Sequence, residues 1–351
     1  MKRILARVFA AIVILLVVVA VALLWMADGV QAPKTFDDPP RQTPGVATTT
    51  STATPDTLTV LTWNIAWGYG WGSEGSGGTL PKAHFDESIA RIGEVLKALN
   101  PDVVLLQEVD FDCGRSYSVD QAEAIAEQAG LPWIARAEVW RANYLPFPYW
   151  PPQNHYGHML SGGAVLSRLP MKQNTIIEHP KPEENSFVYN LGYMFRYLQE
   201  VEVDWAGQSL LVFNTHTDAF SPKNRLAHAG SIARTLTDRM QPLLLFGGDL
   251  NTVPPEASVR SGYPDEPETS HDEDATIPRL RQVKGLSDAV SPERLKADEA
   301  DFMTFPAHTP NRKLDYLFYG PGFEVLEVRV VKEAGDVSDH LPVMMRVRRR
   351  S

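Results

Sequence analysis

Apolar runs of strand length alternate with amphipathic segments of helix length along most of the chain. Strand-like runs lie at residues 57–63, 102–109, 163–169, 197–205, 209–216, 242–249, 313–319, 323–331 and 341–349. Several alternate with period two, and others are solidly apolar. The runs 197–205 and 209–216 are separated by Ala206-Gly207-Gln208, which is a hairpin signal. We therefore expect substantial antiparallel pairing.

Amphipathic helices are predicted between these runs. Residues 84–99 and 224–240 each place their apolar side chains on one stripe. Ser118 and Gln121 form an S-x-x-Q capping box, which predicts a helix that ends at Gly130. Sheets with helices on their outer faces follow from this pattern.

Residues 8–26 are all apolar. A helix rises ~1.5 Å per residue, so this one would cover a hydrocarbon core of ~30 Å. Lys2, Arg3 and Arg7 precede it, which favours a cytoplasmic segment 1–7 and an extracytoplasmic remainder. We interpret residues 8–26 as an uncleaved transmembrane signal anchor of a single-pass membrane protein. A cleaved signal peptide, which would make the domain a secreted one, is the alternative.

The next segment, residues 27–56, is rich in proline and threonine and nearly free of apolar side chains. Such a segment buries too little surface to offset its ordering entropy, so we expect a disordered tether. Residues 57–348 have a uniform texture without a second linker. They are expected to form one domain.

Charge and cysteine content narrow the function classes. The 351 residues carry 33 Lys and Arg against 43 Asp and Glu, a formal net charge of -10. This balance argues against a broad basic face for nucleic acid, although a bound divalent cation would permit a phosphate-bearing substrate. The single cysteine, Cys113, excludes an intramolecular disulfide and is expected to be a buried thiol.

Polar side chains close four of the apolar runs. "LTVLTW" ends at Asn64, "DVVLLQ" at Glu108, "LLVF" at Asn214-Thr215-His216 and "LLLFGG" at Asp249-Leu250-Asn251. One such ending is unremarkable, but four endings that carry oxygen or imidazole donors indicate a shared site at one rim. Since Ser, Cys and Lys do not recur in the set, a covalent nucleophile is not indicated.

Two later segments extend this set. "RKLDYLFY" places Asp315 inside an apolar strand, where a carboxylate needs a partner, and "VSDHLPV" places Asp339 beside His340. Asp315 is suited to orient a histidine and stabilise its charged form. Glu108, Asp339 and Asn64 offer hard oxygens suited to Mg²⁺ or Mn²⁺, whereas the spacing disfavours zinc.

The ordered motifs "WNI", "LQEV", "SGGAVLSRLP", "NTHTD", "GGDLNTVP", "KLDYLFY" and "SDHLPV" resemble the endonuclease/exonuclease/phosphatase superfamily over residues 57–348. The resemblance implies a four-layered α/β sandwich, with two packed, mostly antiparallel sheets and outer helices. It also implies Mg²⁺-dependent hydrolysis of a phosphate ester, with Glu108 as the principal metal ligand beside Asn64 and Asp339. Asp249 and Asn251 would position and deprotonate the attacking water.

The resemblance assigns the remaining residues to the phosphate. His340, oriented by Asp315, would grip the scissile phosphate or act as the general base. His216 would contact another phosphate oxygen or protonate the leaving group, with Asn214 bracing the substrate-binding side. Tyr144 and Tyr156 are alternatives for a tyrosine near the phosphate.

Other polar residues are expected to stay outside the site. The glycines of "SGGAVLSRLP" are interpreted as structural, because they permit close backbone approach. Arg115, Arg196 and Arg225 are each able to reach a phosphate, but they are expected to be solvated, as single arginines usually are.

The natural substrate is left open by the sequence. The aromatic loops "AWGYGWGSEGSGG" and "NYLPFPYWPPQNHYG" are suited to stacking on bases, gripping a lipid headgroup or touching a bilayer, and equally to local packing. We favour a membrane-anchored phosphodiesterase or phosphatase that acts on a lipid headgroup or small phosphodiester. An extracytoplasmic metal-dependent nuclease and a non-catalytic binding module on the same fold are the alternatives. No protein partner is inferred.

Overall fold

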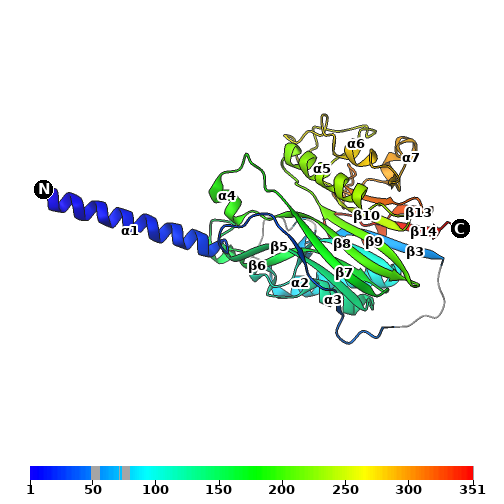
Figure 1. Ribbon diagram of the computed structural model, residues 1–351, viewed down its shortest axis with the longest axis horizontal. Coiled ribbons are helices and arrows are strands. Elements are labelled where there is room, and N and C mark those ends of the chain that lie inside the picture. Colours follow the sequence, from blue (N-terminus) through cyan, green and yellow to red (C-terminus); the bar gives the residue numbers. More distant parts are fainter. Residues whose placement is uncertain (49–55, 71, 73–79, 351) are drawn as a thin grey trace.

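An apolar helix and a layered α/β domain make up residues 1–48, 56–70, 72 and 80–350, which the computed structural model describes (Figure 1). Helix α1 (Lys2–Met26) projects from the domain, and none of its residues is buried. It covers the predicted segment 8–26 and begins earlier. It is long and apolar enough to cross a membrane, a property that a signal sequence shares.

Two seven-stranded sheets form the centre of the described domain. The first contains, from edge to edge, β1 (Thr35–Asp37), β7 (Met171–His179), β8 (Arg196–Trp205), β9 (Gln208–His216), β10 (Leu244–Asp249), β12 (Asp315–Tyr319) and β11 (Ser287–Asp288). The second contains β13 (Phe323–Val330), β14 (Val343–Arg349), β3 (Thr57–Asn64), β4 (Val103–Asp110), β6 (Gly157–Ser167), β5 (Trp133–Leu145) and β2 (Arg41–Gln42). Each sheet is antiparallel except for one inner pair, β9–β10 in the first and β3–β4 in the second.

Helices cover the outer faces of both sheets. Helices α2 (Lys82–Leu99) and α3 (Gln121–Ala129) pack on the second sheet, and α5 (Pro222–Asp238) and α6 (Thr276–Arg281) pack on the first. The shorter helices are α4 (Phe187–Gly192) and α7 (Pro292–Ala297). A third apolar cluster, which includes Leu105 and Val212, fills the space between the sheets. The predicted four-layered sandwich is confirmed.

The predicted hairpin is present, whereas the predicted helix cap is replaced by another residue. The hairpin at residues 206–208 joins β8 to β9 as predicted. The capping box at Ser118 was wrong: Asp120 caps α3 by accepting from the Glu123 backbone N–H. The Gln121 side chain instead accepts from the Asp110 backbone N–H at 2.9 Å and donates to the Trp67 carbonyl at 2.7 Å. This glutamine therefore joins separate elements rather than closing its own helix.

The segment expected to be a disordered tether is ordered over much of its length. Strand β1 pairs with β7, strand β2 pairs with β5, and the Thr43 hydroxyl donates to the Leu131 carbonyl at 2.6 Å. The composition of the segment reflects only the surface that the segment can bury by itself. Edge strands of the domain satisfy its backbone groups instead. Residues 49–55 of the expected tether lie outside the described part of the chain.

Candidate active site

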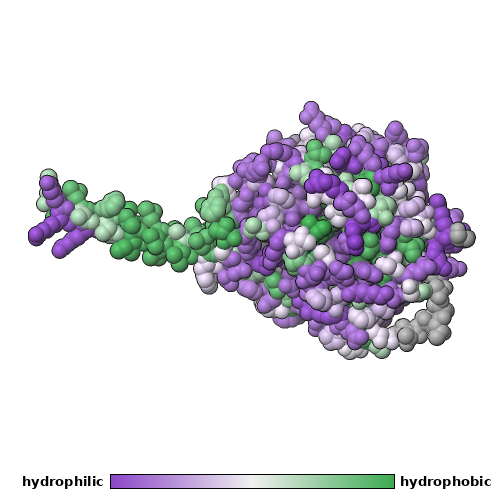
Figure 2. All heavy atoms as spheres, viewed as in Figure 1, coloured by the Kyte–Doolittle hydropathy of each residue, from purple (hydrophilic) through white to green (hydrophobic). Residues whose placement is uncertain are grey.

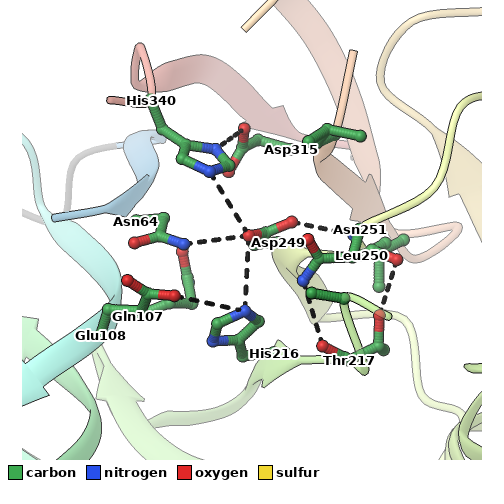
Figure 3. A network of polar contacts seen from close by, with 12 residues as sticks. Asn64, Gln107, Glu108, His216, Thr217, Asp249, Leu250, Asn251, Asp315 and His340 are labelled. Carbon is green, nitrogen blue, oxygen red and sulfur yellow. Dashed lines mark hydrogen bonds and ion pairs between the residues drawn. The ribbon is translucent and has the colours of Figure 1, made fainter. Parts of the chain in front are cut away.

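The polar side chains predicted from the strand ends converge at one end of the sandwich (Figure 3). Asn64 ends β3, His216 ends β9 and Asp249 ends β10, while Asp315 begins β12. In the β9–β10 pair His216 lies directly beside Asp249, and in the antiparallel β10–β12 pair Asp249 lies opposite Asp315. The strand register thus places donors from both sheets at one rim.

Asp249 lies at the centre of this cluster and is almost completely buried. Its Oδ2 accepts a hydrogen bond from Asn64 Nδ2 at 3.0 Å and lies 3.5 Å from His216 Nε2 and 3.7 Å from His340 Nε2. Its Oδ1 accepts from the Asn251 backbone N–H at 2.8 Å. Burial raises the pKa of Asp249 to about 6, against the opposing effect of His340. The carboxylate is therefore held rigidly between two imidazoles.

Glu108 reaches the site because its strand is irregular. The β4–β6 register shifts between Gln107 and Val109, and Glu108 has a φ of 55°, so the extra residue of a β-bulge turns this side chain toward the rim. Its Oε1 lies 3.8 Å from His216 Nε2. Burial and the neighbouring Asp339 raise the pKa of Glu108 to about 8. The half-buried Asp339 accepts from Ser338 Oγ at 3.3 Å.

His340 is oriented by Asp315, as predicted from the buried position of that carboxylate. Its Nδ1 lies 2.8 Å from Asp315 Oδ2, which leaves Nε2 directed at Asp249 (Figure 3). Burial opposes the charged imidazole, but the carboxylates of Asp315 and Asp249 outweigh it and raise the pKa of His340 to about 10. At neutral pH this ring is a cation.

His216 has the opposite electrostatic setting, because an arginine faces it. Arg196 Nη1 lies 2.7 Å from His216 Nε2, and an arginine only donates, so Nε2 is the acceptor and the ring is neutral. Burial, followed by Arg196 and His340, holds the pKa of His216 well below its usual range. We expected Arg196 to be solvated, but it is buried. Arg196 begins β8, which pairs with the strand that ends in His216. Its contact with His216 could therefore be predicted only once the strand pairing is known.

Two of the predicted residues lie differently from their expected roles. Asn214 is fully buried, donates to the Leu106 carbonyl at 3.0 Å and accepts from Gln107 Nε2 at 2.7 Å. It bonds the two sheets together and does not face a substrate. Asn251 has a φ of 47° and donates from Nδ2 to the Thr217 carbonyl at 3.1 Å. The backbone N–H of Asn251 therefore donates to Asp249, while its side chain donates to the loop after β9.

The other two arginines expected to be solvated are buried in ion pairs. Arg115 pairs with Asp110 at 2.8 Å, and Arg225 pairs with Asp274 at 2.8 Å. Asp110 ends β4, five residues before Arg115, whereas Asp274 lies in the distant connection before α6. Cys113 is buried, as predicted.

A narrow cleft of about 10 Å³, enough for roughly one water molecule, lies between the two sheets beside the cluster. Its lining residues are Trp67, Glu108, Val139, Trp140, Ser161, Gly162, Met194, Phe195, Arg196, Tyr197 and His216. Of the two tyrosines considered from the sequence, Tyr156 is buried against Trp140, and Tyr144 bonds His155 Nδ1 through its hydroxyl at 2.7 Å. The tyrosine in the cleft lining is Tyr197. Residues 71 and 73–78 of the first aromatic loop lie outside the described residues.

One group of donors has its ligand atoms close together, and a second is suited to a divalent cation by the chemistry of its oxygens, although Asn64 Oδ1 also accepts from the Ala66 backbone N–H at 3.0 Å. Asp249, Asp315 and His340 offer ligand atoms within 4.8 Å of one another. In that set, however, His340 Nδ1 is already bonded to Asp315. The second set consists of the predicted oxygens of Asn64, Glu108 and Asp339, whose hard donors suit Mg²⁺ or Mn²⁺. Burial, and after it the negative charge of Asp339, raise the pKa of Glu108, and a cation between the two carboxylates would favour their ionised forms.

The fold and the site together define a class of protein: a two-sheet α/β sandwich with imidazoles and carboxylates at its strand ends. The chain belongs to the Endonuclease/Exonuclease/phosphatase family, whose sequence profile matches residues 61–340. The resemblance carried by the sequence motifs is confirmed. No protein with a curated description matches the chain.

Solved structures support the same fold. An endonuclease/exonuclease/phosphatase from Beutenbergia cavernae DSM 12333 is 24% identical with a TM-score of 0.55, over 84% of this chain and 72% of that one. A mannosyl-6-phosphatase from Bacteroides thetaiotaomicron VPI-5482 is 18% identical with a TM-score of 0.55, over 83% and 99%. D. rerio TDP2, complexed with a single-strand DNA product, is 17% identical with a TM-score of 0.53, over 84% and 99%.

Proposed function

We propose that the chain is a membrane-anchored hydrolase of phosphate esters that depends on Mg²⁺ or Mn²⁺. The observation that carries this proposal is the buried cluster in which His340 and His216 face Asp249 from two sides. A charged imidazole and a nearby arginine supply positive charge for a phosphate, and a carboxylate supplies a proton acceptor. The family to which the chain belongs, with the named phosphatase among its structural neighbours, supports the same reaction class.

Asn64, Glu108 and Asp339 are proposed to hold the metal. Their oxygens are hard donors, and Glu108 is turned into the site by the bulge. We prefer this set because His340 Nδ1 is engaged by Asp315, which leaves the imidazole to act on substrate. When bound, the cation supplies Lewis-acid stabilisation of negative charge on the phosphate oxygens.

The side chains of the cluster divide the remaining chemistry. Asp249, held by Asn64 and the Asn251 backbone N–H, accepts a proton from the attacking water. The water oxygen bonds to phosphorus, the ester P–O bond breaks, the leaving oxygen takes a proton from bulk water, and Asp249 afterwards releases its proton to solvent. His340 donates from Nε2 to a phosphate oxygen, where negative charge accumulates. His216, positioned by Arg196, lines the cleft beside a second oxygen.

The membrane arrangement follows from α1. We propose that residues 1–7 are cytoplasmic and that residues 57–348 act on the opposite side, with a lipid headgroup or small phosphodiester as substrate. The second candidate is an extracytoplasmic nuclease, favoured by the structural neighbour that holds a DNA product. A non-catalytic module is disfavoured, because a chain without activity has no need to keep Glu108, Asp249 and His340 together.

Metal titration of the Glu108→Gln variant tests the proposal. The full chain in detergent micelles should hydrolyse bis-p-nitrophenyl phosphate with Mg²⁺ and stop when EDTA is added. Glu108→Gln should raise the Mg²⁺ concentration for half-maximal rate by ~10–100-fold, since it removes one anionic ligand oxygen. Turnover is measured by nitrophenolate absorbance over a series of Mg²⁺ concentrations.

The matched control is Glu87→Gln, which changes an exposed glutamate of α2. This variant should keep the wild-type metal response. A Glu108→Gln curve identical to wild type would remove Glu108 from the metal site. No turnover of this ester, single-stranded DNA or phospholipid, with or without metal, would support the non-catalytic module.

A further inference from the structure

A large apolar cavity lies where α1 meets the domain. It has a volume of about 500 Å³, which is within the range of small-molecule and lipid sites. The last turn of α1 contributes Leu23 and Met26 to its wall, and Tyr144, Leu191 and Phe220 are among the domain residues that line it. Its wall is therefore made jointly by the apolar helix and the domain.

The mouth of this cavity carries exposed aromatic and aliphatic side chains. Of the lining residues, Phe220 is 80% exposed, and Tyr149, Val188 and Tyr189 are at least half exposed. Trp150 and Phe187, which are exposed as well, are adjacent in sequence to Tyr149 and Val188. Figure 2 shows apolar side chains along α1 that continue onto the domain where the helix meets it. An apolar patch of this kind marks an interaction surface.

The position of α1 indicates that a lipid bilayer covers this apolar patch. The helix is held on the domain by Asn143 Nδ2, which donates to the Trp25 carbonyl at 2.8 Å, and by Gln31 Nε2, which donates to the Arg141 carbonyl at 3.2 Å. The cavity mouth therefore lies at the level where the apolar helix ends. In a bilayer this level is the interface, where aromatic side chains concentrate.

The cavity also adjoins the catalytic cleft. Trp140 and Met194 line both of them, and the cleft contains Glu108 and His216. An amphiphile with its apolar tail in the cavity would direct its polar end toward the cleft.

We propose that this cavity holds an acyl chain of a phospholipid from the surrounding bilayer, with the lipid phosphate directed toward the cleft. The assignment of the phosphate rests on the proposed function, whereas acyl-chain binding rests on the cavity and on α1 alone. The mouth of the cavity, which includes Tyr149 and Phe220, then lies on the bilayer surface. The domain is thereby seated on the membrane instead of hanging from a tether.

Photolabelling tests acyl-chain binding without relying on activity. The full chain is placed in phosphatidylcholine nanodiscs that contain a phosphatidic acid with a diazirine in its acyl chain, with EDTA present to prevent turnover. After photolysis, mass spectrometry should find lipid adducts on residues 142–149 as well as on α1. The double variant Val188→Asp/Phe220→Asp should lower labelling of 142–149 at least fivefold, because it places two charges at the mouth.

Val259→Asp is the matched control, since Val259 is also about half exposed but does not line the cavity. It should label like wild type. Circular dichroism checks that each variant is folded. We expect folding to be retained, because the substituted side chains are exposed. Adducts confined to α1, equal labelling in the double variant, or protein–protein crosslinks in place of lipid adducts would overturn the proposal.

Activity supplies a separate measurement. With Mg²⁺, the ratio of the rate on dioleoyl phosphatidic acid to the rate on bis-p-nitrophenyl phosphate should fall at least fivefold in the double variant. An unchanged ratio would contradict the placement of the phosphate. If no ester is hydrolysed, the proposed function fails, while the labelling result still decides what the cavity binds.

Discussion

The two histidines of the site differ in charge because their neighbours differ. Burial lowers the pKa of His340, but the negative charges of Asp315 and Asp249 outweigh burial and raise this pKa to about 10. His216 is buried against Arg196, which keeps the imidazole neutral. Titratable groups whose pKa values are driven apart in one cluster are characteristic of divided roles in catalysis. His340 is therefore suited to hold charge on the phosphate, and His216 is not.

Replacing His340 with alanine should show what this charge contributes. We expect kcat on bis-p-nitrophenyl phosphate to fall by ~10²–10⁴, because the variant loses a charged donor at the phosphate. His158→Ala is the control, since the side chain of His158 is 49% exposed. A His340→Ala enzyme with wild-type kcat would remove this residue from the mechanism.

At the level of elements, close packing of backbones positions the cleft. Glycines of β6 were expected to permit such packing, and they do. A Cβ at Gly163 would lie 1.7 Å from Tyr197 Oη and 2.9 Å from the Leu106 carbonyl oxygen. A Cβ at Gly162 would lie 1.8 Å from the Ala137 carbonyl oxygen. These glycines bring β6 against β5 and the opposite sheet, where Tyr197 lines the cleft.

Gly163→Ala should therefore destabilise the domain. The added methyl group must displace the buried Tyr197 or the backbone of β4, and overpacking of this kind costs ~1–3 kcal/mol. The free energy of unfolding is measured by urea titration in detergent. Gly230→Ala in α5 is the matched control, because the nearest atom to its Cβ is 3.9 Å away. The control should raise stability by ~0.4–1 kcal/mol, and a stable Gly163→Ala variant would show that the interface can yield.

Across the whole molecule, a buried ion pair ties the long connection after β10 to the helical layer. Arg225 of α5 donates to Asp274 at 2.8 Å, and both side chains are only 1% exposed. Burial opposes the ionised carboxylate, but the neighbouring His271, whose Nδ1 lies 4.0 Å from Asp274 Oδ2, and the charge of Arg225 outweigh it and hold the pKa of Asp274 well below its usual range. The stability that this pair contributes is present above the pKa of an unfolded aspartate and is lost as pH falls toward the folded value.

Asp274→Asn should expose that pH dependence. At pH 7 the variant leaves Arg225 buried without its counter-charge, so the free energy of unfolding should fall by ~3–5 kcal/mol. The difference from wild type should shrink below about pH 4, where unfolded aspartate binds a proton. Urea unfolding at pH 7, 5 and 3 measures this. Asp272→Asn, an exposed neighbour, should match wild type at each pH, and a constant deficit for Asp274→Asn would refute the linkage.

Much of the fold was predictable because its periodicities are strong. The solid apolar runs became β3, β4, β9 and β10, and their polar ends became the rim. Strand β5 was not predicted, because alanines at its buried positions and charges at Arg136 and Glu138 weaken the apolar alternation. The edge strands β1 and β2 were not predicted either, since short polar segments form strands only when a sheet edge offers hydrogen bonds.

The sequence by itself indicated most of the polar side chains that meet at the rim, because apolar strands that end in Asn, Glu, His and Asp can be recognised from residue order alone. Only the tertiary structure decided how those donors act. Arg196 faces His216, Asn214 is saturated inside the sandwich, and α1 forms one wall of an apolar cavity. The charge states of the histidines, the burial of Asn214 and the walls of the cavity all depend on distances between segments far apart in the chain. Strand register sets those distances.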